Sequence, residues 1–217
     1  MTATSDTQTL DVFADVSVAC AALARKDAVL GRAIDAIDKP HIRRRPGGFE
    51  ALFRIIVEQQ VSVPSAQAIW KRCRENIKPM SAKTVLAKTE ADLRACGLSR
   101  PKARYVGALA QAVVDGDINF DDIAMLDNER AAEKLITVKG LGPWSAAIYL
   151  LFCEGRIDIW PMRDVALLGA YNAGRLRGRD LDMATLDERA QKWRPYRGVA
   201  AHILWTYYAH IRGRTPI

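Results

Sequence analysis

The stretch that decides the fold is Thr137–Phe152, which reads TVKGLGPWSAAIYLLF. A helix-favouring run at residues 131–136 precedes it, and Gly140 and Gly142 end that run because glycine frees the backbone. Pro143 then suits the first turn of a new helix, where its missing N–H is no loss. Apolar residues recur at helical spacing after it. The sequence therefore predicts a helix, a tight hairpin and a second helix.

The hairpin is suited to holding a phosphate group. Gly140 and Gly142 let the backbone come close to a ligand. The N–H groups in the first turn of the next helix point outward, with the positive end of the helix dipole behind them. Lys139 would add a positive charge beside them. A plain turn between two helices is the alternative, and it is the commoner meaning of a lone Gly-x-Gly pair.

A downstream carboxylate makes the pattern specific. Residues 138–149 together with Asp164 resemble the helix–hairpin–helix superfamily of base-excision DNA glycosylases. The resemblance implies that the hairpin holds a backbone phosphate and that Asp164 faces the flipped nucleotide. Family members that also cut the strand carry a lysine nucleophile at the position of Trp144. The chain therefore resembles the monofunctional alkylpurine branch, DNA-3-methyladenine glycosylase II.

Three other segments resemble the same family, at residues 56–63, 96–105 and 193–205. In the first, Gln60 stands where a family side chain fills the gap left by the extruded base, and Gln59 precedes it. The alternative is that Gln59 and Gln60 only cap the end of a helix and have no role in DNA binding. The residues expected to contact DNA are Gln60, Lys102, Lys139, Gly140, Gly142 and Arg163. Idle surface charge is the alternative for the basic members of this set.

The base pocket is expected to be aromatic. Trp144 and Trp205 occupy family positions that line it, and Gln59 is counted with them as substrate-binding. Trp160 is a third candidate wall, although a core position suits it better. A cationic purine stacked on an indole gains roughly 0.5–2 kcal/mol from the cation–π interaction. Ile148 stands where some relatives have an aromatic ring, which affects the breadth of base recognition.

Asp164 is the predicted catalytic residue. Breaking the bond between C1′ and the base nitrogen leaves an oxocarbenium-like sugar, which a nearby carboxylate stabilises. The same carboxylate can orient or deprotonate a water molecule. An N-cap is the alternative role for Asp164, and the two roles are compatible. A non-catalytic helix–hairpin–helix DNA-binding protein, a glycosylase–lyase and a glycosylase for another damaged base are the competing functions.

The resemblance also bears on metal ions. Relatives bind a monovalent cation through hairpin carbonyls, and Ile136, Val138 and Leu141 occupy those positions. The resemblance therefore implies a structural Na⁺ or K⁺ ion and no catalytic cofactor. Some relatives hold an iron–sulfur cluster on four closely spaced cysteines near the C-terminus. The four cysteines here are scattered and none follows Cys153, so no cluster is expected.

The net charge and the distribution of apolar residues bear on the partner and the location of the protein. The chain has 217 residues and a formal net charge of +7, which favours a polyanionic partner. The resemblance implies that this partner is double-stranded DNA with alkylated bases. No apolar run is long enough for a membrane span, and the N-terminus lacks the features of a signal peptide. We expect a monomer in the cytoplasm, associated with the nucleoid if the source is bacterial.

The periodicity predicts an all-α protein of about ten helices in two lobes, with a DNA cleft between them. Residues 1–10 are expected to be disordered, and residues 11–217 to form the helical domain, with the helix–hairpin–helix near 131–152. Residues 115–127 are expected to be a linker. The segment ahead of the first family-like stretch is too short for an added N-terminal α/β domain.

Overall fold

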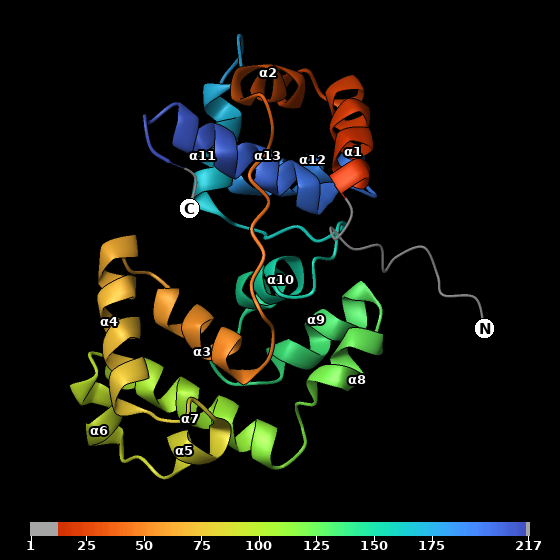
Figure 1. Ribbon diagram of the computed structural model, residues 1–217. Coiled ribbons are helices and arrows are strands. Elements are labelled where there is room, and N and C mark those ends of the chain that lie inside the picture. The colour runs from red at the N-terminus through yellow and green to blue at the C-terminus, as the bar shows by residue number, and fades with distance from the viewer. Residues whose placement is uncertain (1–12, 216–217) are drawn as a thin grey trace. The chain divides into compact units, whose positions relative to one another are not determined.

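The structure, a computed structural model, describes residues 13–215, and within that range it contains helices and no β-strand (Figure 1). The predicted all-α class is confirmed. The prediction of disorder for residues 1–10 lies outside the described residues. The helices before the hairpin are α1 (Phe13–Lys26), α2 (Ala28–Ile37), α3 (Phe49–Glu58), α4 (Val63–Asn76), α5 (Ala82–Leu86), α6 (Glu90–Ala95), α7 (Arg100–Val114), α8 (Phe120–Met125) and α9 (Asn128–Ile136). The helices after it are α10 (Pro143–Phe152), α11 (Val165–Ala173), α12 (Met183–Ala190), the 3-10 helix η2 (Gln191–Trp193) and α13 (Arg197–His210).

Short polar side chains explain where several helices begin. Asp27 precedes α2, Ser62 precedes α4 and Ser99 precedes α7, and each side chain accepts a hydrogen bond from an N–H of the first turn. Such an N-cap contributes on the order of 1 kcal/mol. The three side chains therefore set the first residues of α2, α4 and α7.

Two stretches differ from the sequence prediction. The expected linker at residues 115–127 contains helix α8, which Asn119 begins by accepting hydrogen bonds from the N–H groups of Asp121 and Asp122. A helix of six residues is too short to show a helical period, which is why the pattern missed it. Residues 183–193 likewise form α12 and η2, where no helix was predicted.

The chain divides into two compact units. Unit 1 comprises residues 1–44 and 150–217, and unit 2 comprises residues 45–149. Helix α10 begins in unit 2, and from Leu150 onward it belongs to unit 1. The DNA cleft expected between two lobes stays a prediction.

In unit 2, helix α3 forms the centre of the core. Helix α7 packs against both α3 and α5, and α4 packs on α3. Leu52, Phe53 and Ile56 are completely buried, and the Phe53 ring lies 5.9 Å from that of Trp70. Burial of each such side chain stabilises the fold by about 1.5–3 kcal/mol.

In unit 1, helix α13 has the central place and packs against α1, α2 and α11 (Figure 1). Every residue from Gly198 to Thr206 is buried. Gly198 has no room for a side chain, because an added Cβ would lie 2.7 Å from the Ile157 carbonyl oxygen. The tight fit brings the chain that leads to Asp164 directly against this helix.

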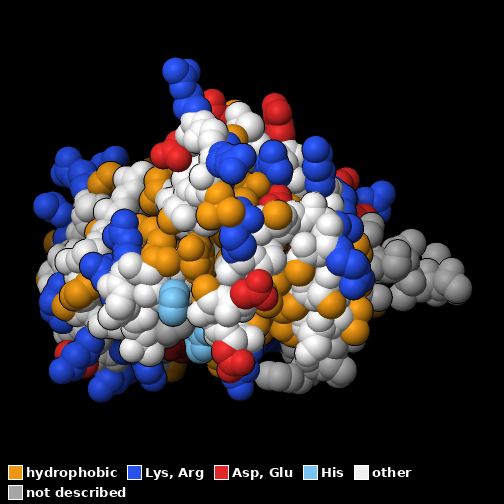
Figure 2. Space-filling model, turned by 90° about the horizontal axis from the view of Figure 1, so that it is seen from above, with side chains coloured by type: hydrophobic (Ala, Val, Ile, Leu, Met, Phe, Trp, Pro, Cys, Tyr) orange, Lys and Arg blue, Asp and Glu red, His pale blue; other side chains and the backbone are white. Residues whose placement is uncertain are grey.

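The surface drawn in Figure 2 carries more Lys and Arg side chains than Asp and Glu side chains, in keeping with the formal net charge of +7. Within residues 13–215, every helix is too short or too polar to cross a bilayer.

Candidate functional site

The predicted hairpin is present in unit 2, between α9 and α10. The Leu141 N–H donates to the Val138 carbonyl oxygen at 3.0 Å and closes the turn. Gly140 has φ +98, and a Cβ there would lie 2.2 Å from the Tyr105 ring. Gly142 is different, since a Cβ there would meet nothing within 4 Å. Gly140 is therefore required by the fold, whereas Gly142 leaves an open approach to the backbone.

Gln59, at the end of α3, holds the hairpin in place. Its side-chain nitrogen donates to the Gly140 carbonyl oxygen and to the Ser145 hydroxyl, both at 2.9 Å. Ser145 is buried, so both bonds lie in a region where an unmet polar group would be costly. The sequence placed Gln59 in the base pocket, and the structure gives it this contact with the hairpin backbone. Its contact with substrate stays a prediction.

Lys102 supports the same region from α7. Its ammonium donates to the Val57 carbonyl oxygen at 2.8 Å and to the Gln59 carbonyl oxygen at 2.6 Å. Lys102 is 9% exposed, and burial lowers the pKa of its ammonium below the usual value for lysine. The positive charge lies at the negative end of the α3 dipole, which stabilises it. Lys102 thus braces the end of α3, and its predicted contact with DNA stays a prediction.

These residues surround a cavity of about 740 Å³ in unit 2. It is lined, among others, by Gln59, Gln60, Lys102, Tyr105, Gly140 and Gly142. The structure therefore brings together five residues that the sequence proposed separately, and it adds Tyr105. The exposed Lys139 is beside them in the hairpin.

The end of α3 also presents apolar surface that sequence reasoning missed. Gln60 is exposed and has φ +52, a left-handed conformation that costs a non-glycine residue about 1–2 kcal/mol. Val61 follows it, is 37% exposed and lines the cavity. Side chains that unstack bases are usually apolar, which makes Val61 a second candidate wedge beside Gln60. The sequence signal that could have identified Val61 as a candidate wedge is its position directly after Gln60.

Asp164 begins helix α11 in unit 1. Its Oδ1 accepts hydrogen bonds from the N–H groups of Ala166 at 2.9 Å and Leu167 at 3.0 Å. The N-cap role considered from the sequence is confirmed. The residue is partly exposed, and both capping bonds go to the same carboxylate oxygen.

The loop before Asp164 is anchored to helix α12. Trp160 is 6% exposed, and its Nε1 donates to Asp187 Oδ1 at 2.8 Å. Its ring meets that of Trp193 edge-on at 5.3 Å. Trp160 is thus buried in unit 1, as the core alternative expects, and its place as a wall of the base pocket stays a prediction. Arg163, the neighbour of Asp164, is exposed and has φ +60.

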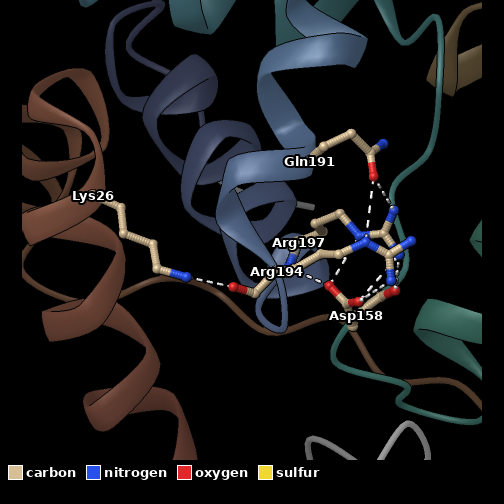
Figure 3. A network of polar contacts seen from close by, with 5 residues as sticks. All are labelled: Lys26, Asp158, Gln191, Arg194 and Arg197. Carbon is tan, nitrogen blue, oxygen red and sulfur yellow. Dashed lines mark hydrogen bonds and ion pairs between the residues drawn. The ribbon is translucent and has the colours of Figure 1, made fainter.

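A second buried carboxylate fixes the start of this segment. Asp158 is 5% exposed and accepts from Arg197 Nε at 2.9 Å and from Arg194 Nη1 at 3.2 Å (Figure 3). Gln191 accepts from both arginines, and Lys26 donates to the Arg194 carbonyl oxygen (Figure 3). The network fastens the chain ahead of Asp164 to the N-terminus of α13.

Trp205 belongs to a buried aromatic cluster of unit 1. It is 7% exposed, and its ring lies 5.4 Å from Phe152 and 5.7 Å from His202. The Arg43 guanidinium lies 5.2 Å over the Trp205 ring. Burial, with the nearby Arg43 charge, lowers the pKa of His202 to about 3, so its imidazole is neutral. The ring of Trp205 already faces a cation, and stacking on a base stays a prediction.

Trp144 lies in the first turn of α10 and is partly exposed, while Ile148 one turn further on is buried. The predicted cation ligands lie where α9 passes into the hairpin. Val138 and Leu141 are buried, and Ile136 is 42% exposed. The Val138 carbonyl oxygen accepts the hairpin hydrogen bond, and binding of Na⁺ or K⁺ there stays a prediction.

The cysteines at positions 20, 73, 96 and 153 form no disulfide bond. Among residues 13–215, His, Cys, Asp and Glu side chains form no cluster of three or more suited to a metal ion.

The chain is similar to known DNA repair proteins. DNA-3-methyladenine glycosylase 1 of Schizosaccharomyces pombe is 29% identical over 162 residues, which cover 72% of this chain and 71% of that protein. The alkylbase DNA glycosidase-like protein mag2 of the same yeast is 27% identical over 171 residues, covering 76% and 79%. The crystal structure of a DNA-3-methyladenine glycosidase from Bacillus halodurans matches with a TM-score of 0.76 at 25% identity, over 96% of this chain and 95% of that one.

The family model described as "HhH-GPD superfamily base excision DNA repair protein" matches residues 53–195. That range includes the end of α3, the hairpin with its cavity, and Asp164 at the start of α11. The match spans more than half of the chain and contains both the turn and the carboxylate that the sequence singled out. The chain therefore belongs to the HhH-GPD superfamily of base excision DNA repair proteins.

Proposed function

We propose that this protein is a monofunctional DNA glycosylase that excises alkylated purines, 3-methyladenine and 7-methylguanine among them, from duplex DNA in base-excision repair. The observation that carries the proposal is Asp164, a partly exposed carboxylate fixed at a helix N-terminus through one of its oxygens. The names of the relatives support the choice of alkylated bases. We further propose that it acts as a monomer in the cytoplasm.

The proposed reaction begins with capture of the duplex. The hairpin backbone at Gly142 binds a phosphate, and Lys139 adds charge. The damaged nucleotide leaves the stack, and Gln60 or Val61 fills the gap. Rotating a base out of the duplex costs a few kcal/mol, least for a damaged base, which gives part of the selectivity.

Asp164 then acts on the extruded nucleotide. Its negative charge stabilises the oxocarbenium-like sugar as the bond between C1′ and the base nitrogen breaks, and it orients the attacking water. An alkylated purine such as 3-methyladenine carries a positive charge and leaves as a neutral base, so it requires no proton from a general acid. The aromatic ring of Trp144 is the proposed stacking surface for this cation.

The proposal excludes strand cleavage because the position of the family's lysine nucleophile is occupied by Trp144, which has no amine. The experiment is release of free base from a panel of duplexes that carry 3-methyladenine, 7-methylguanine, 8-oxoguanine or uracil, with borohydride added in parallel. Release of the alkylated bases without a trapped covalent adduct is expected. Binding without release of any base would favour a non-catalytic DNA-binding protein, and a trapped adduct would favour a glycosylase–lyase.

A further inference from the structure

The carboxylate of Asp187 holds the loop that leads to Asp164. Asp187 belongs to α12, is 9% exposed, and lies in the same unit as Asp164. Its Oδ1 accepts two hydrogen bonds, from Trp160 Nε1 at 2.8 Å and from the backbone N–H of Arg163 at 3.4 Å. A single carboxylate oxygen therefore fastens both ends of the short stretch 160–163.

The second of these hydrogen bonds is donated by the backbone N–H of Arg163, a residue with an unusual backbone conformation. Arg163 has φ +60, in the left-handed region that residues other than glycine rarely adopt. Such a conformation persists only where the surroundings enforce it. Asp164 follows at once with extended backbone, φ −79 and ψ 116, and begins α11. The turn at Arg163 sets the direction from which the chain enters that helix.

The two hydrogen bonds that Asp187 accepts come from neutral donors, and both donors belong to this loop. A carboxylate at this depth loses hydration, and two neutral donors compensate for that only in part. An apolar side chain would avoid the loss and still fill the space. What the carboxylate provides, and an apolar side chain would not, is a pair of hydrogen bonds that hold residues 160–163 in place.

We infer that Asp187 is a positioning residue for the excision reaction, acting on Asp164 through Trp160 and the Arg163 turn. The inference rests on the proposed function of Asp164 as the carboxylate beside the reacting sugar. Residues that hold a catalytic group within a fraction of an ångström of its working position affect the rate of the chemical step more than the binding of substrate.

The test compares Asp187→Leu, Asp187→Asn and Trp160→Phe in the full chain. The first removes the acceptor, the third removes the indole donor, and the asparagine keeps an oxygen that can accept both bonds. The measurements are the single-turnover rate of 3-methyladenine release at saturating enzyme and the Kd for a duplex with an abasic site. We expect Asp187→Leu and Trp160→Phe to lower the rate about tenfold or more with Kd within about twofold. Asp187→Asn should stay within about threefold of the parent rate.

Asp182→Ala is the matched control. Asp182 is the exposed N-cap of the same helix, and its side chain accepts from the Thr185 N–H. Its loss weakens α12 without touching the Asp187 bonds, so we expect a lower melting temperature and the parent rate. The inference is overturned if Asp187→Leu excises at the parent rate. It is also overturned if Asp182→Ala, at an equal loss of melting temperature, loses as much rate.

A second readout does not depend on catalysis. The N–H groups of Ala166 and Leu167 bond to Asp164, and the Arg163 N–H bonds to Asp187. Their hydrogen exchange should be faster in Asp187→Leu than in Asp182→Ala, and equal exchange would overturn the inference. If the parent protein releases no alkylated base, the proposed function fails, while the exchange rates still decide whether Asp187 positions Asp164.

Discussion

The side-chain amide nitrogen of Gln59, Nε2, donates a hydrogen bond to the carbonyl oxygen of Gly140 at 2.9 Å, across 81 positions of the chain. This bond joins the end of α3, where Gln60 and Val61 are exposed, to the hairpin. The element proposed to fill the gap in the duplex and the element proposed to hold the phosphate are therefore fixed to each other within unit 2. Lys102 braces the same place through the Val57 and Gln59 carbonyl oxygens.

The first prediction follows from that bond. Gln59→Leu leaves the Gly140 carbonyl and the Ser145 hydroxyl without this donor, and we expect the free energy of unfolding to fall by about 1–3 kcal/mol. Urea denaturation measures the loss. Gln60→Leu is the control, because Gln60 is exposed and should alter stability little. Equal stability of the Gln59→Leu and Gln60→Leu proteins would show that the tie between α3 and the hairpin is energetically unimportant.

The second prediction concerns phosphate binding at Gly142. A Cβ at this position meets nothing within 4 Å, so Gly142→Asp should fold normally. Its carboxylate would repel the DNA phosphate, and we expect binding to weaken tenfold or more, about 1.4 kcal/mol. Titration of duplex DNA at several salt concentrations measures this, and the parent affinity should fall steeply with salt.

Two alanine variants, Gly142→Ala and Gly140→Ala, separate the effect of the added carboxylate on DNA binding from the effect of adding a Cβ to the hairpin backbone. Gly142→Ala should keep the parent melting temperature. Gly140→Ala should lower it, because its φ is +98 and its Cβ would overlap the Tyr105 ring. Normal DNA binding by a folded Gly142→Asp protein would remove the hairpin from the proposed interface.

The third prediction concerns the charge of Asp164. Asparagine caps a helix about as well as aspartate, so Asp164→Asn should change stability little. If the carboxylate stabilises an oxocarbenium-like sugar, single-turnover release of 3-methyladenine should fall about a hundredfold or more. DNA binding, measured in parallel, should stay close to that of the parent. A variant as active as the parent would leave Asp164 with its capping role alone.

The fourth prediction concerns pH. Burial lowers the pKa of His202 to about 3 in the folded protein, whereas an unfolded histidine titrates near its usual value of 6.5. Between these values the unfolded state binds more protons, so stability rises with pH through this window and is lost as the pH falls. The slope for one such group approaches about 1.4 kcal/mol per pH unit.

Chemical denaturation of the parent and of His202→Phe at pH 4, 5, 6 and 7 measures this dependence. Phenylalanine does not titrate and preserves an aromatic ring beside Trp205 and Phe152. We expect the variant to have the flatter profile. Parallel profiles for the two proteins would assign the acid sensitivity to other groups.

Local chemistry is what the sequence by itself determined about this protein. The two glycines and the proline of the hairpin, and the capping residues Asp27, Ser62 and Asp164, act on backbone groups within a few positions of themselves. Such hydrogen bonds are set by neighbours in the chain, so the helix–hairpin–helix and the N-cap at Asp164 could be predicted. Helix α8 was missed because six residues are too few to show a period.

The tertiary structure alone decided which partners the polar side chains take. The contact of Lys102 with DNA stays a prediction, and the fold adds partners that the sequence did not indicate, the carbonyl oxygens of Val57 and Gln59, more than forty positions away. Trp160 is buried, and its indole donates to Asp187 on another helix, a partner that the sequence did not indicate. The acceptor that a polar side chain finds depends on contacts between distant segments, and the spacing of residues in the sequence does not specify it.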